Sequence, residues 1–189
     1  MDLKSSELAL ENRDGLPDSL RYLAQSFPSA EWQGHPNFGQ LVQFWLSRHA
    51  MFRQVTETLL TGAQKVLWSG ADIEAFHPRL ARMGGFFLQE LHTHHTVEDD
   101  HYFPQLIGLE PKLDRGFAVL DADHHALDAL LDDFAKTANA ALQSDAASHR
   151  DTLGAFHTHL TRLSRSLERH LQDEEELIVP IILKTGFAG

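Results

Sequence analysis

Apolar side chains recur at steps of three and four residues along most of the chain, beginning at Phe38. This spacing places them on one face of an α-helix, and no period-two alternation is long enough to indicate a β-sheet. Short segments rich in Gly, Pro, Ser and Asp separate four such stripes. The stripes cover residues 38–66, 76–98, 117–138 and 153–177. The pattern predicts an all-α fold, an up-down-up-down four-helix bundle with short connections.

Glycines and prolines indicate where these helices begin and end. The first 35 residues contain Gly15, Pro17, Pro28 and Gly34 and show no sustained helical periodicity. We therefore predict an N-terminal extension, residues 1–35, that packs on or flanks a bundle formed by residues 36–184. Pro104 and Pro180 follow the second and fourth stripes, and each is expected to end its helix because proline lacks the backbone donor.

Composition narrows the range of functions. The 189 residues include 16 Lys and Arg against 27 Asp and Glu, for a formal net charge of −11 at pH 7. Such a chain is not expected to bind nucleic acid or an anionic membrane, which require clustered basic residues. The absence of cysteine excludes disulfides, thiolate metal sites and cysteine nucleophiles. No signal-peptide pattern or bilayer-length apolar run is present, and a cytoplasmic location is expected.

Six ionisable side chains occupy stripe positions where Leu or Phe would be expected. Because residues four apart share a helix face, a histidine and a glutamate from the second stripe face the same core, and so do a pair from the fourth. A buried carboxylate without a partner costs several kcal/mol, and a bound metal would compensate that cost. The six residues are His49, His94, Glu98, His124, His170 and Glu174.

The spacing of these residues repeats along the chain. The interval from His49 to His94 is 45 residues, and the interval from His124 to His170 is 46. Each second histidine begins a His-x-x-x-Glu motif, and a proline follows each glutamate six residues later. A helix of about 20 residues, followed by a second helix that runs back beside it, brings the second histidine to the level of the first. Two such hairpins would gather four imidazoles and two carboxylates in one layer of the core.

With these motifs the chain resembles the hemerythrin-like family, also called the HHE cation-binding domain. The matching segments are residues 48–52, 94–100, 123–125 and 170–176. The resemblance implies two non-haem iron ions, carboxylate-bridged and oxo- or hydroxo-bridged, with zinc or manganese as substitutes. Its implied bridging ligands are Glu98 and Glu174. By resemblance, His49 and His94 bind one iron, whereas His124 and His170 bind the other.

Two departures from the oxygen-carrying members bear on function. Those members have a fifth histidine four residues after the third-helix histidine, where this chain has Asp128. Their last carboxylate is an Asp five residues past its histidine, whereas Glu174 lies four past and Glu175 five past. A site short of one imidazole leaves a coordination position open, which favours reaction or sensing over oxygen carriage. We therefore expect a protein that binds or senses O₂, NO or peroxide, or iron itself.

Several side chains near the six remain open. Asp128 is a ligand, a partner of a ligand or a solvated charge, and Glu175 is expected at the surface or beside a ligand. His101 forms Glu98-x-x-His101, a step typical of ferritin-like di-iron bundles, although the other half of that pattern is missing. His95 points away from the apolar stripe and is expected to face solvent.

Three alternative functions also remain open. The chain could be a di-iron oxidase or peroxidase, which requires an electron donor that no sequence feature names. It could bind zinc or another divalent metal without redox chemistry. It could also be a metal-free bundle whose polar core residues specify packing. A small diatomic or peroxide ligand is the expected partner. A homodimer is compatible with a bundle of this size, although no particular residues indicate its interface, and no residues identify a redox or signalling partner.

Overall fold

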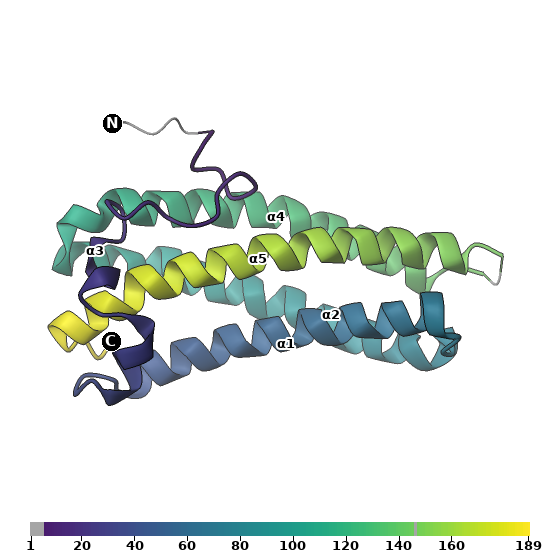
Figure 1. Ribbon diagram of the computed structural model, residues 1–189. Coiled ribbons are helices and arrows are strands. Elements are labelled where there is room, and N and C mark those ends of the chain that lie inside the picture. The colour runs from purple at the N-terminus through teal and green to yellow at the C-terminus, as the bar shows by residue number, and fades with distance from the viewer. Residues whose placement is uncertain (1–5, 146) are drawn as a thin grey trace. The chain divides into compact units, whose positions relative to one another are not determined.

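The computed structural model describes residues 6–145 and 147–189, and within these residues it contains α-helices and no strand. The predicted all-α class is therefore confirmed. Four long helices correspond to the four apolar stripes, and a short one, α3, follows the second (Figure 1). None of the helices in the described residues is long and apolar enough to cross a membrane. The α-helices are α1 (Gln40–Ser69), α2 (Ile73–Val97), α3 (Phe103–Leu109), α4 (Asp114–Leu142) and α5 (His149–Thr185).

The predicted helix ends at the two prolines were wrong. After α2 the chain forms one turn of π-helix, η3 (Glu98–Tyr102), in which the Phe103 N–H donates to the Glu98 carbonyl, and then continues as α3. Pro104 lies in the first turn of α3, where a missing N–H costs nothing. Helix α5 continues through Pro180 because its last turns are buried on nearly every side, so packing offsets the lost hydrogen bond.

One compact unit of the chain comprises residues 6–50, 95–125 and 168–189. Its core includes the N-terminal segment, which also forms the short 3-10 helices η1 (Tyr22–Gln25) and η2 (Ser29–Gly34). Leu16, Leu20 and Trp32 are buried in one cluster with residues of α1, α4 and α5. A further 3-10 turn, η4 (Pro111–Leu113), leads into α4.

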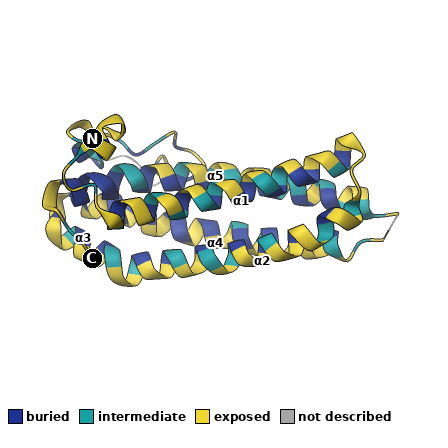
Figure 2. Ribbon diagram, turned by 90° about the horizontal axis from the view of Figure 1, so that it is seen from below, coloured by how far each residue is buried: buried dark blue, intermediate teal, exposed yellow. Residues whose placement is uncertain are grey.

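The other unit comprises residues 51–94 and 126–167. Its core is built from aromatic rings at stripe positions: Phe87 lies 6.1 Å from Phe52 and 5.7 Å from Phe134, between ring centroids. Phe134 in turn lies 5.5 Å from Phe156. The same amphipathic pattern is visible along the helices in Figure 2, where buried residues alternate with exposed ones at helical spacing.

Gly116 of α4 permits a close backbone approach in the first unit. A Cβ at this position would lie 2.9 Å from the Leu20 carbonyl oxygen and 3.0 Å from Leu177. We expect Gly116→Ala to destabilise the protein by about 1–3 kcal/mol through overpacking, as measured by urea unfolding. Gly154→Ala is the control, since a Cβ there meets nothing within 4 Å and should stabilise α5 by about 0.5–1 kcal/mol. Equal effects of the two changes would contradict the close approach.

Candidate metal centre

His49 lies in α1 and reaches two successive glutamates of α5. Its Nε2 is 3.4 Å from Oε2 of Glu174, and its Nδ1 is 2.9 Å from Oε1 of Glu175. His49 and Glu174 are completely buried, whereas Glu175 is partly exposed. The imidazole is thereby held between a core carboxylate and a more exposed carboxylate.

His170 of α5 has the same arrangement toward different partners. Its Nε2 is 3.6 Å from the same Oε2 of Glu174, and its Nδ1 is 3.3 Å from Oδ2 of Asp123 on α4. One oxygen of Glu174 is therefore shared between the Nε2 atoms of His49 and His170. The other oxygen accepts a hydrogen bond from the Trp45 indole Nε1 at 2.5 Å.

His124 of α4 also lies between two carboxylates, those of Glu98 and Asp99 at the start of the π turn. Its Nε2 is 3.7 Å from Oε2 of Glu98, and its Nδ1 is 2.9 Å from Oδ1 of Asp99. The Nε2 atom is buried and makes no hydrogen bond among the described residues. Because π turns occur often at functional sites, the insertion that begins at Glu98 is a second local signal of a site here.

The three histidines share one arrangement of their ring nitrogens. In each, Nδ1 faces a carboxylate of its own, and Nε2 is directed toward a buried glutamate. A carboxylate at Nδ1 fixes the proton there and leaves the Nε2 lone pair available to a metal ion. This donor set of neutral imidazoles and carboxylates is suited to iron, zinc or manganese.

Electrostatics also favour a bound cation. Burial raises the pKa of Glu98 to about 8, whereas the neighbouring Glu174 carboxyl opposes this shift and Asp99 adds to it. Two buried glutamates in contact are expensive to keep ionised without a positive charge between or beside them. A divalent ion would supply that charge.

Five of the six residues predicted from the sequence lie together in the first unit, and all five are buried: His49, Glu98, His124, His170 and Glu174. One potential ligand atom from each of His49, Glu98 and Glu174 lies within 4.8 Å of the others. The sixth residue, His94, belongs to the other unit, where it is half-buried near the end of α2, one turn before Glu98 in the sequence. Its ring packs 5.2 Å from that of Phe52.

His95 corrects the sequence interpretation. It was expected to face solvent, but it is buried, with 4% of its surface exposed. Its ring stacks on His124 at a centroid distance of 4.0 Å and lies 5.4 Å from His170. One potential ligand atom from each of these three histidines lies within 4.8 Å of the others. The apolar stripe did not reveal His95 because the stripe marks one face of α2, and His95 flanks that face.

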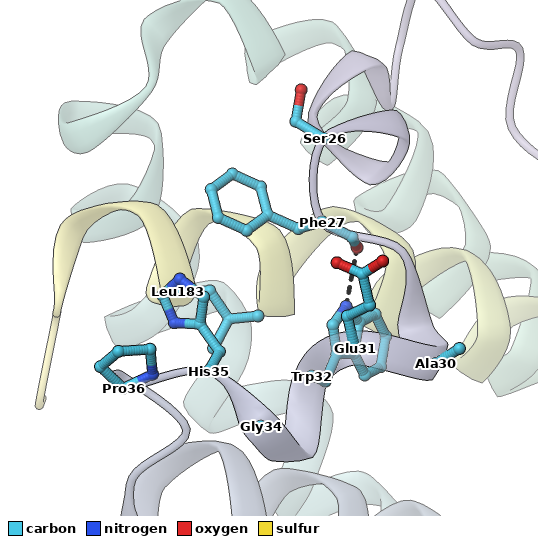
Figure 3. Close-up of a pocket in the computed structure, with 9 residues that line it drawn as sticks. All are labelled: Ser26, Phe27, Ala30, Glu31, Trp32, Gly34, His35, Pro36 and Leu183. Atoms are coloured by element: carbon cyan, nitrogen blue, oxygen red, sulfur yellow. Dashed lines mark hydrogen bonds between the residues drawn. The ribbon is translucent and has the colours of Figure 1, made fainter.

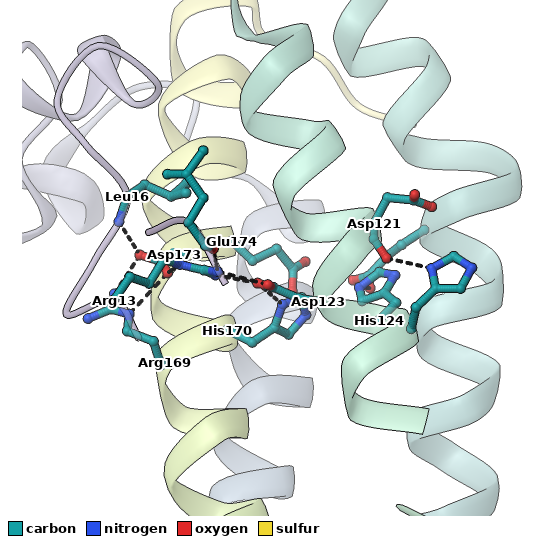
Figure 4. A network of polar contacts seen from close by, with 12 residues as sticks. Arg13, Leu16, Asp121, Asp123, His124, Arg169, His170, Asp173 and Glu174 are labelled. Carbon is teal, nitrogen blue, oxygen red and sulfur yellow. Dashed lines mark hydrogen bonds and ion pairs between the residues drawn. The ribbon is translucent and has the colours of Figure 1, made fainter. Parts of the chain in front are cut away.

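Arg13, a residue of the N-terminal segment, was not among the residues predicted from the sequence. Its guanidinium is buried, forms an ion pair with Asp123 and donates through Nε to Oδ2 of Asp173 at 2.9 Å. Burial raises the pKa of Asp123, and Arg13 opposes that shift. Figure 4 shows Arg13 between the two aspartates, with Asp123 continuing to His170.

Asp173 is bound from two further directions. Arg169 of α5 donates two hydrogen bonds to it, and the backbone N–H of Leu16 donates to its Oδ1 at 2.9 Å. The N-terminal segment is therefore fixed to α5 by both a side chain and a main-chain group. No periodic pattern in residues 1–35 could have indicated these contacts.

The side chains whose roles the sequence left open differ in their exposure and contacts. Asp128 and His101 are exposed and belong to neither cluster of potential metal ligands found among the described residues. His101 instead packs its ring 5.9 Å from Tyr102. Glu175 holds Nδ1 of His49, as described above.

A pocket of about 580 Å³ lies elsewhere in the first unit, between the N-terminal segment and the end of α5 (Figure 3). Trp32 closes one side and donates its indole N–H to the Phe27 carbonyl at 2.8 Å. The residues that line the pocket include one carboxylate and one imidazole, those of Glu31 and His35. It therefore lacks the converging donors that the histidine and glutamate cluster provides.

Comparison with protein families gives one match. The family model described as the Hemerythrin HHE cation binding domain matches residues 40–182. That range includes all six predicted ligands and His95, and leaves out the whole of the N-terminal segment, residues 1–35. No curated protein and no solved structure matches the chain.

Proposed function

Because the chain belongs to the hemerythrin HHE cation-binding family, we propose that it holds two non-haem iron ions and uses them to bind or sense O₂, NO or peroxide, or iron itself. The family assignment supports metal binding, commonly of iron, and the buried histidines and glutamates fit a metal ion. We also infer that the four long helices are arranged as an up-down-up-down bundle around this centre.

The proposed ligands are those that the sequence indicated. His49 and His94 would bind one ion, His124 and His170 would bind the other, and Glu98 and Glu174 would be the carboxylate ligands that the two ions share. In support, Glu174 is near both His49 and His170, at 3.4 and 3.6 Å from their Nε2 atoms. A carboxylate shared by histidines from two different helices suits a bridging role.

One observation supports the proposal above the others: three buried histidines each have a dedicated carboxylate at Nδ1 and direct Nε2 toward a buried glutamate. A buried histidine with a purely structural role in the core needs one hydrogen-bond partner. Three imidazoles oriented in this way are typical of metal ligands supported by an outer layer of hydrogen bonds.

When bound, paired iron ions supply one-electron redox changes and open coordination positions for a small ligand. The protein's own groups supply the rest. Asp99, Asp123 and Glu175 hold the imidazole rings in orientation, and the Trp45 N–H fixes one oxygen of Glu174. The two buried glutamates would balance the positive charge of the bound ions.

The test of this function is to reduce iron-loaded protein anaerobically and then add O₂, NO and hydrogen peroxide in separate experiments. A stoichiometric change in the absorption spectrum with at least one of them is expected. Sustained consumption of a reductant with any of them would indicate an oxidase or peroxidase. A protein that retains zinc in preference to iron and gives no spectral change would contradict the proposed redox function.

A further inference from the structure

The sequence pattern assigns two histidines, His124 and His170, to one ion. In the structure His95 joins them, and the three side chains form one cluster. All three side chains are at least 96% buried, and their ring centroids lie 4.0 to 5.4 Å apart. Each contributes a nitrogen within 4.8 Å of the other two. Three histidines that converge so closely form a donor set for a divalent cation.

Two of the three histidines are already oriented by partners outside the cluster. Nδ1 of His124 faces Asp99, and Nδ1 of His170 faces Asp123, so their Nε2 atoms are the ones available inside. His95 stacks on the first ring at an interplanar angle of 11° and meets the second edge-on at 80°. His95 therefore shares one buried space with both rings, and one of its nitrogens lies within 4.8 Å of a nitrogen of each.

The helix explains why two adjacent histidines both reach the centre. Glu98 is four residues after His94 and three after His95. Residues three and four positions apart lie next to each other on one side of a helix, so both His94 and His95 lie on the side of the helix that carries Glu98.

We propose that His95 is a third imidazole ligand of the ion held by His124 and His170. This inference rests on the proposed metal centre and makes it asymmetric, with three histidines at one ion and two at the other. The exposed Asp128 has no part in it.

The first experiment is a Co²⁺ titration of metal-free wild type, His95→Ala and His92→Ala, followed by the visible spectrum. His92 is exposed on the same helix, three residues earlier, and serves as the matched control. We expect two equivalents to bind to wild type and His92→Ala, whereas His95→Ala binds one of them at least tenfold more weakly. Unchanged binding of both equivalents by His95→Ala would overturn the role of His95. Failure of wild type to bind two equivalents would instead refute the centre itself.

A second measurement needs no variant. Ring ¹⁵N NMR of wild type with and without Zn²⁺ distinguishes metal-bound from free imidazole nitrogens. A metal-bound shift is expected for His95 together with His124 and His170, and no shift for His92. If His124 and His170 shift on loading and His95 does not, His95 is not a ligand.

Discussion

Replacing Arg13 by alanine is expected to lower the free energy of unfolding by about 3–5 kcal/mol, because it leaves buried carboxylates without their cation. Arg13 pairs with both Asp123 and Asp173, and all three side chains are almost completely buried. Asp173 keeps its bonds from Arg169, whereas Asp123 loses both of its guanidinium contacts and keeps its contact with His170. Chemical unfolding of metal-free protein measures this loss directly.

The control for this change is Arg165→Ala, an exposed arginine of α5, which should alter stability by no more than about 0.5 kcal/mol. Arg13→Lys should recover only part of the loss, since an ammonium group cannot reproduce the two-sided contact of the guanidinium. Equal stabilities of Arg13→Ala and Arg165→Ala would show that the buried network contributes nothing to folding.

Replacing Glu98 by glutamine is expected to have opposite effects in metal-free and metal-loaded protein. Burial raises the pKa of Glu98 to about 8, so the folded metal-free protein holds this proton more tightly than the unfolded chain does. The contribution of the group to stability is then complete below the unfolded pKa near 4.5 and is lost as pH rises toward 8. Glu98→Gln should remove this decline and make metal-free protein more stable at pH 8.

In metal-loaded protein the same substitution removes a bridging carboxylate. We expect metal affinity to fall at least about 100-fold, equivalent to about 2.8 kcal/mol of binding free energy. Melting temperatures at pH 5 and pH 8, each with chelator and with iron, measure both effects. Glu57→Gln is the control, because Glu57 is exposed on α1. If Glu98→Gln lowered stability equally with and without metal, its role would be structural packing alone.

Much of this molecule could be predicted from the helical periodicity. The apolar stripes predicted the four long helices. The ionisable residues at stripe positions include five buried residues of the candidate metal centre. Periodicity works here because an apolar face has to be buried and His49 or Glu174 on that face is buried with it. The helix ends predicted from Pro104 and Pro180 were wrong for two reasons. Pro104 lies in the first turn of α3, which accommodates proline, and the packing around Pro180 offsets the lost hydrogen bond.

The rest could not be predicted because it depends on contacts between distant parts of the chain. Arg13 lies 110 residues from Asp123 and 160 from Asp173, in a segment without any repeating pattern. His95 is missed because it flanks the apolar stripe, although its three-residue step to Glu98 was visible in the sequence. A search for histidines at both three and four residues from a core glutamate would have found it.

The most direct test of the central claim is an anaerobic titration of metal-free protein with Fe²⁺, with bound iron determined after gel filtration. We expect saturation at two irons per chain, together with a higher melting temperature of the loaded protein. A stably folded protein that retains no iron would contradict it, and the buried histidines and glutamates would then form only a polar core.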